Sequence, residues 1–188
     1  MKELLLPINF QLVLAGMVFF FFGYALAPLV YHKQIKPLTA FPLWIAAKLE
    51  KESQAKWNPY LLFLFIFVLN SISLSIDFVS GFVLFLPILL AVWTGLNVGI
   101  VTFHTLKGTF YYAALFNPVA LFELPAVFCT FALALGLNIR ESGLEILNLN
   151  SDLSLYLNTF LWLVIPLLLI AAVVEAVFIH WAQKMEQK

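Results

Sequence analysis

The chain has 188 residues, of which 63% are hydrophobic and only 11% are charged. Soluble domains carry about 25% charged residues and about 45–50% apolar ones, so this composition excludes an ordinary water-soluble domain. Ten basic and ten acidic residues balance, which argues against a nucleic-acid-binding surface, and the single cysteine, Cys129, excludes a disulfide within the chain.

Five apolar segments are long enough to cross a bilayer, whose hydrocarbon core takes about 20 helical residues. We predict spans at about residues 10–30, 60–76, 82–103, 118–137 and 155–181. The predicted fold class is therefore all-α, an integral membrane bundle of five transmembrane helices. We expect residues 1–188 to form one transmembrane domain.

The first apolar run, about residues 10–30, has a signal peptide as its alternative interpretation. Ala25-Leu26-Ala27 resembles a small-residue cleavage site. The run is long for a signal peptide, however, and Pro28 would directly follow the cut. We therefore favour a membrane span.

The segment that follows is polar and contains an amphipathic pattern at about residues 40–56. Its apolar residues recur at helical spacing opposite three charged ones: Phe41, Trp44, Ile45 and Leu49 against Lys48, Lys51 and Glu52. This pattern predicts an interfacial amphipathic helix, in contact with the lipid bilayer, between the first and second spans. A solvated linker helix is the alternative.

One continuous apolar stretch, residues 59–103, contains a single charge, Asp77. It is about twice the length that the bilayer core requires, so it must fold into two helices. Asp77-Phe78-Val79-Ser80-Gly81 supplies turn-forming residues, and we expect the Asp77 charge to lie outside the membrane. Asn70, in the middle of the second span, is expected to form a packing hydrogen bond.

Two connections complete the chain. Between the third and fourth spans, Tyr111 and Tyr112 suit the headgroup level, and Asn117-Pro118 opens the fourth span. Between the fourth and fifth spans, residues 138–153 are polar.

Lysine distribution predicts the orientation. The face shared by residues 32–58, the Lys107 loop and the C-terminus carries eight lysines, and the other face carries only Lys2 and Arg140. The positive-inside rule then places the protein in the cell membrane with its N-terminus outside and its C-terminus in the cytoplasm.

Polar residues gather near the cytoplasmic ends of the spans. Glu123 and Glu175 both lie about 9 Å below the same surface, by the helical rise. Asn97 falls at a similar depth, and His104 and Lys107 lie just above. This polar cluster has three interpretations: a structural hydrogen-bonding role, a partner-binding or gating site, or an ion or proton path through Glu123 and Glu175.

Small residues at intervals of four mark close helix packing. They are Gly95 and Gly99 in the third span, and Ala132 and Gly136 in the fourth. Packing within the chain is favoured over dimerisation, with a homo-oligomer as the alternative.

No catalytic pattern is found. The sequence has no HExxH, nucleophile-elbow or P-loop motif, and no Cys/His set with zinc spacing. We therefore expect no enzyme activity and no cofactor.

The order of these features resembles the stage II sporulation protein M family of multi-pass membrane proteins. The resemblance covers residues 57–181. It is carried by Asn70, Gly95-Leu96-Asn97-Val98-Gly99, Phe122-Glu123-Leu124-Pro125-Ala126, Gly136 and Ala171-Ala172-Val173-Val174-Glu175-Ala176. Two elements depart from the family: Asn117-Pro118 stands where relatives often have His-Gly, and Thr94 where they often have Asn.

The resemblance implies a membrane scaffold that recruits or localises a peptidoglycan-degrading complex during engulfment of the forespore. We therefore expect a non-catalytic scaffold whose partners are other membrane or cell-envelope proteins. The alternative is a transporter or channel component that uses Glu123 and Glu175.

Overall fold

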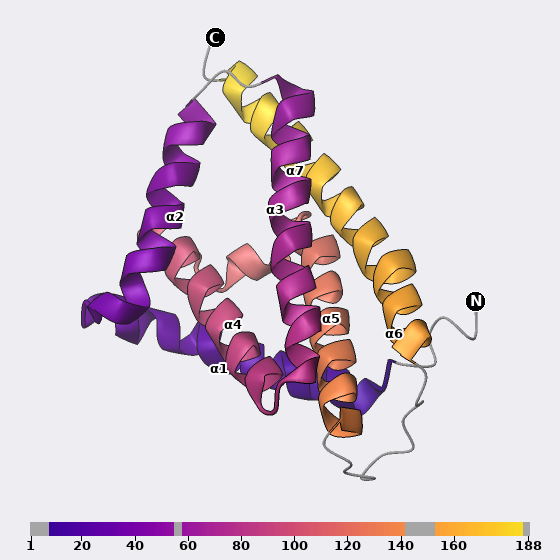
Figure 1. Ribbon diagram of the computed structural model, residues 1–188. Coiled ribbons are helices and arrows are strands. Elements are labelled where there is room, and N and C mark those ends of the chain that lie inside the picture. The colour runs from indigo at the N-terminus through magenta and orange to yellow at the C-terminus, as the bar shows by residue number, and fades with distance from the viewer. Residues whose placement is uncertain (1–7, 55–57, 142–152, 186–188) are drawn as a thin grey trace.

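The computed structural model describes residues 8–54, 58–141 and 153–185, except the side chains at 49–54, 141 and 182–185 (Figure 1). The described residues form helices and turns, without a strand. In chain order the elements are α1 (Phe10–His32), α2 (Lys36–Gln54), α3 (Pro59–Val79), the 3-10 turn η2 (Ser80–Phe82), α4 (Leu86–Thr105), the 3-10 turn η3 (Ala113–Phe116), α5 (Ala120–Glu141), α6 (Leu153–Thr159), the π-helical turn η4 (Phe160–Val164) and α7 (Ile165–Met185).

Five of the described helical segments are long and apolar enough to cross a membrane. They are Phe10–His32, Pro59–Phe82, Leu86–Thr105, Ala120–Arg140 and Leu153–Trp181. The prediction of an all-α bundle with five spans is therefore confirmed. The bounds differ slightly, because α3 continues into the predicted turn as far as Val79, and α4 and α5 begin later than predicted.

Side-chain contacts give the relative directions of the helices. Gly23 of α1 lies against Val92 of α4, and Tyr31, near the end of α1, bonds to His104 near the end of α4. Because the contacts advance together along both helices, α1 and α4 run parallel. This is the direction expected of a first and third span in a chain that crosses five times.

The other packed pairs complete the same alternation. On α3 and α7, Leu62 and Ile66 pack against Ala176 and Ala172, while Phe78 stacks on Phe160 at 4.9 Å near the other end. These two helices are antiparallel. The start of α1 therefore lies at the opposite end of the bundle from the end of α7.

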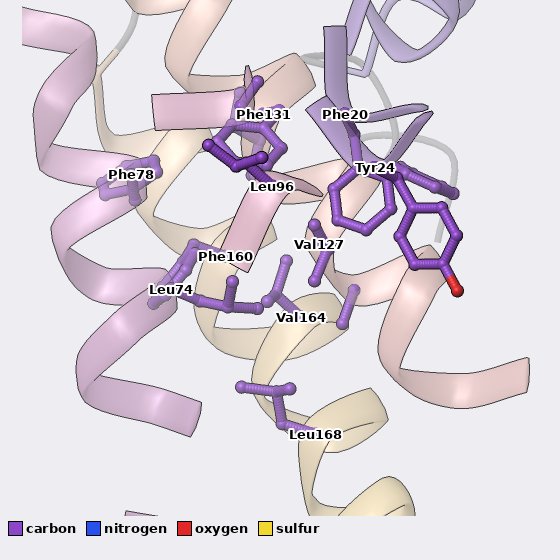
Figure 2. Close-up of a cluster of buried hydrophobic side chains, with 14 of the residues drawn as sticks. Phe20, Tyr24, Leu74, Phe78, Leu96, Val127, Phe131, Phe160, Val164 and Leu168 are labelled. Atoms are coloured by element: carbon purple, nitrogen blue, oxygen red, sulfur yellow. The ribbon is translucent and has the colours of Figure 1, made fainter. Parts of the chain in front are cut away.

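The centre of the bundle is filled by large apolar side chains. Figure 2 shows Phe20 and Tyr24 of α1, Leu96 of α4, Phe131 of α5 and Val164 of η4 in one cluster. Phe20 meets Phe128 edge-on, with ring centroids 5.5 Å apart. Interiors packed in this way have little freedom to rearrange, so the centre holds the helices in fixed positions.

The turn after α3 corrects one prediction. Asp77 is not a turn residue, because α3 continues through it to Val79, and only 4% of its surface is exposed; whether it lies outside the membrane stays a prediction. The chain reverses at residues 80–85, where Phe85 adopts a left-handed φ of 61°. Asn138 Nδ2 of α5 donates to the Val83 carbonyl at 2.8 Å and to the Gly81 carbonyl at 3.3 Å, which fixes this turn to the end of α5.

The fifth span contains a π-helical turn with a local cause. Pro166 has no N–H and leaves the carbonyl four residues earlier without its helical partner. Just before it, the Ile165 N–H bonds to the Phe160 carbonyl, which is the wider π spacing. The turn therefore joins α6 and α7 into one continuous span.

The helix predicted at about residues 40–56 is α2, which runs along the side of the molecule toward the end where the C-terminus lies (Figure 1). Its buried residues, Thr39, Pro42 and Ala46, lie on a different face from Phe41 and Trp44, which are more than half exposed. An interfacial position for α2 stays a prediction. The side chains of Leu49, Lys51 and Glu52, and most of the polar connection at 138–153, lie outside the described residues.

Candidate functional site

The two acidic residues of the predicted polar cluster lie on neighbouring helices. Glu123 is in the first turn of α5, and Glu175 is on α7 between Ala172 and Ala176, which pack against α3. α5 packs against α7, and Glu123 and Glu175 are close enough to interact electrostatically. We call these two residues the acid pair.

The start of α5 positions Glu123. Asn117 caps the helix, because its Oδ1 accepts from the Ala120 N–H at 2.7 Å and its carbonyl accepts from the Leu121 N–H. The positive end of the helix dipole then lies beside the Glu123 carboxyl group. The helix dipole therefore stabilises a negatively charged carboxylate at a depth where the surrounding hydrocarbon destabilises it.

The acid pair has free hydrogen-bonding capacity. Both side chains are partly exposed at the bundle surface, and no donor among the described residues reaches either carboxyl group. Two like charges near each other in a medium of low dielectric constant repel strongly. An added donor or cation beside the pair would relieve both the repulsion and the missing hydrogen bonds.

The other three residues of the predicted cluster have different contacts. Asn97 Nδ2 donates to the Trp93 carbonyl of its own helix at 2.7 Å, and its Oδ1 is buried without a partner among the described residues. His104 Nδ1 is hydrogen-bonded to the Tyr31 hydroxyl at 3.0 Å, and Lys107 is exposed just beyond α4. The structure thus separates the five residues into the acid pair on α5 and α7, Asn97 in the middle of α4, and His104 and Lys107 at the end of α4.

The residues predicted to mediate helix packing lie at close approaches. A Cβ at Gly95 would collide with the Phe20 carbonyl of α1, and one at Gly99 would lie 2.6 Å from the Ala27 Cβ. Gly23 of α1, which the sequence analysis did not single out, approaches the Val92 carbonyl of α4 in the same way. These glycines allow α1 and α4 to touch backbone to backbone.

The two small residues predicted to pack in the fourth span, Ala132 and Gly136, contact other helices. Ala132 is fully buried with Leu12 of α1, and a Cβ at Gly136 would lie 2.9 Å from the Tyr156 ring of α6. Asn70 is half-buried on α3, and its side chain forms no hydrogen bond within the described part of the chain.

A tyrosine pair between α1 and the α4–α5 connection was missed by sequence reasoning. Tyr111 is only 5% exposed, so its ring packs inside the protein and does not face the lipid, whereas Tyr112 is 64% exposed. The Tyr111 hydroxyl donates to the Tyr24 carbonyl at 2.5 Å, the Tyr24 hydroxyl donates to the Tyr111 carbonyl at 2.8 Å, and the rings stack at 4.4 Å. Burial, and then the neighbouring Tyr24, raise the pKa of the Tyr111 hydroxyl, which therefore stays neutral and able to donate.

The comparisons with known proteins decide the family. The model of the stage II sporulation protein M family matches residues 10–178. The chain belongs to this family. This match confirms the resemblance and extends it to α1 and α2, and with the five apolar spans it makes the chain a multi-pass membrane protein. Neither the curated proteins nor the solved structures contain a significant match.

Proposed function

We propose that this member of the stage II sporulation protein M family is a non-catalytic scaffold in the cell membrane. It holds other membrane or cell-envelope proteins in place, and peptidoglycan-remodelling proteins are the class that its family indicates. The observation that carries the proposal is the acid pair, two partly exposed carboxyl groups within membrane spans without a donor among the described residues. Intramembrane acids of this kind call for a partner.

The chemistry of the pair defines the kind of partner. A partner helix that presents a lysine or arginine side chain at the depth of Glu123 and Glu175 would supply both the missing donors and the opposite charge. The packed centre supports this role, because Phe20, Phe131 and Leu168 are fully buried and fix the helices, whereas both glutamates stay partly exposed. A rigid bundle with acceptors on its surface suits docking.

The proposed orientation places the N-terminus outside and the C-terminus in the cytoplasm. The lysine-rich segment 32–58, Lys107 and the C-terminus then share the cytoplasmic face. C-terminal fusions to a fluorescent protein, active in the cytoplasm, and to alkaline phosphatase, active outside, test this orientation. Activity of the phosphatase fusion alone would reverse it.

In-cell crosslinking with quantitative mass spectrometry tests the scaffold. Wild type is compared with the Glu123→Gln, Glu175→Gln double variant at equal membrane abundance. We expect wild type to retrieve specific envelope proteins and the double variant to lose them, because glutamine keeps the shape but removes the charge.

The matched control is Glu50→Gln, Glu52→Gln, which makes the same charge change on α2. It should retrieve the wild-type partners. Retention of every partner by the acid-pair variant would reject the acid pair as a docking site. Retrieval of no envelope protein by wild type would reject the scaffold itself.

A transporter or channel component is the second candidate, because paired intramembrane acids also mark ion and proton paths. Purified protein in liposomes tests it directly. A proton or ion flux that disappears in the acid-pair variant would favour this function over the scaffold.

A further inference from the structure

Three lysines and two histidines gather where α1 and α4 end side by side. The Tyr31 hydroxyl is 3.0 Å from His104 Nδ1, and the His32 ring lies 5.3 Å from the Phe103 ring. Because these contacts bring the two helix ends together, the residues that directly follow them also lie in one region. We call this region the basic corner; its cationic and titratable members are His32, Lys33, Lys36, His104 and Lys107.

The lysines of the basic corner have no counter-charge among the side chains that the structure describes. Lys33, Lys36 and Lys107 are all exposed, and none of them forms an ion pair with a described residue. Of the acidic side chains that the structure describes, Glu123 and Glu175 belong to α5 and α7, and Asp77 lies near the end of α3. The described part of the corner therefore presents a positive surface.

The level of the corner in the membrane follows from the two spans that it ends. The apolar segments Phe10–His32 and Leu86–Thr105 both finish here. Beside them, Phe110 is 83% exposed and Tyr112 is 64% exposed. Exposed aromatic rings next to lysines at the end of a span are typical of the headgroup region. The three ammonium groups thus stand where lipid phosphates lie.

We propose that the basic corner binds the headgroup of an anionic phospholipid. Charge complementarity identifies the ligand: three exposed ammonium groups, without acidic neighbours, face a layer of phosphodiester groups. Lysine is a compact, flexible point charge that suits a phosphate oxygen, and each one near an anionic surface strengthens binding about fivefold.

This inference is independent of the scaffold proposal, because it uses none of the acid-pair residues. It predicts a site that selects lipids by headgroup charge, in addition to the general solvation of the spans. The selected lipid would fix the level at which α1 and α4 end in the leaflet.

Native mass spectrometry of the purified full-length protein in a neutral detergent tests the site. Dioleoylphosphatidylglycerol is titrated as the anionic probe and dioleoylphosphatidylcholine as the neutral one. We expect wild type to retain phosphatidylglycerol and to release phosphatidylcholine. The Lys33→Gln, Lys36→Gln, Lys107→Gln triple variant should bind phosphatidylglycerol on the order of 100-fold more weakly, at about fivefold per lysine.

The matched control is the Lys48→Gln, Lys51→Gln, Lys56→Gln triple variant, which removes the same charge from α2 and the segment after it. It should stay within about twofold of wild type, because these lysines lie outside the corner. If the corner triple variant does not fold, Lys36→Gln and Lys107→Gln are measured singly, each with an expected loss of about fivefold.

Three results would overturn the proposal. Equal binding of phosphatidylcholine would remove the headgroup selectivity. Equal losses in both triple variants would show a diffuse attraction rather than a site at the corner. Displacement of the lipid by inorganic phosphate at low concentration would assign the corner to free phosphate instead.

Discussion

The close approach of α1 and α4 gives the sharpest prediction, for Gly95→Ala. A Cβ at this position would overlap the Phe20 carbonyl oxygen, which is part of a helix backbone and has no rotamer by which to move away. The two helices must separate along an interface that also contains Tyr24 and Leu96. Overpacking of a core costs about 1–3 kcal/mol, and a backbone neighbour places this variant at the upper end.

Helix propensity predicts the opposite sign. Alanine is about 1 kcal/mol better than glycine inside a helix, so a variant without a steric clash would be stabilised. We expect a net loss of about 2 kcal/mol for Gly95→Ala. For a chain of this size each kcal/mol lowers Tm by about 2–4 °C, which gives a shift of about 4–8 °C.

Thermal unfolding of the purified protein in detergent, followed by loss of the monodisperse peak on gel filtration, measures the shift. The control is Gly16→Ala on α1, whose Cβ would first meet the Phe131 Cβ at 3.0 Å, so that the two helices need to part by only a few tenths of an ångström. It should stay within about 1 kcal/mol of wild type. A Gly95→Ala protein as stable as wild type would refute the backbone-contact argument.

Three further predictions use the same assay. Tyr111→Phe leaves a buried carbonyl of α1 without its donor and should cost about 1–2 kcal/mol, whereas Tyr112→Phe, at an exposed ring, should change Tm little; equal shifts would contradict the buried pair. Asn138→Ala removes both hydrogen bonds to the turn after α3 and should lower the free energy of unfolding by about 1–3 kcal/mol. An unchanged Tm would show that the turn is stable without these hydrogen bonds. Glu123→Gln and Glu175→Gln should each leave stability unchanged or raise it, because either one removes a like-charge repulsion; a marked loss in both would favour the structural interpretation of the acid pair.

Sequence was sufficient for the spans because the thickness of the bilayer fixes the length of each apolar run. The prediction was less exact at the ends of the spans. The turn residues near Asp77 marked the reversal, but α3 continues to Val79, where Asn138 from a distant part of the chain holds the turn. Such a long-range bond leaves no local signal.

The glycine positions show a second limit. Gly95 and Gly99 were recognisable from their spacing, but the same spacing in α1, between Gly23 and Ala27, was passed over although Gly23 makes the equivalent approach. Tyr111 is similar. Its position in a polar connection favoured the headgroup level, and only the fold reveals that the Tyr111 ring packs against α1 and α4.

The polar cluster was predicted from the depth of its residues alone, and this limited the prediction. Helical rise places Glu123, Glu175 and Asn97 at one level, but it does not tell which helices are neighbours. The structure packs α4 mainly against α1, and α7 against both α3 and α5. Residues of equal depth are thereby divided between two faces of the bundle.

This division separates the two proposals experimentally. The basic corner is exposed at the headgroup level, so its binding of an anionic lipid should weaken steeply as ionic strength rises. The acid pair lies within membrane spans, where mobile ions do not enter, so partner retention through Glu123 and Glu175 should change little over the same range. If salt abolished both together, the partner would be held through the lipid at the corner, and the acid pair would be left without a docking role.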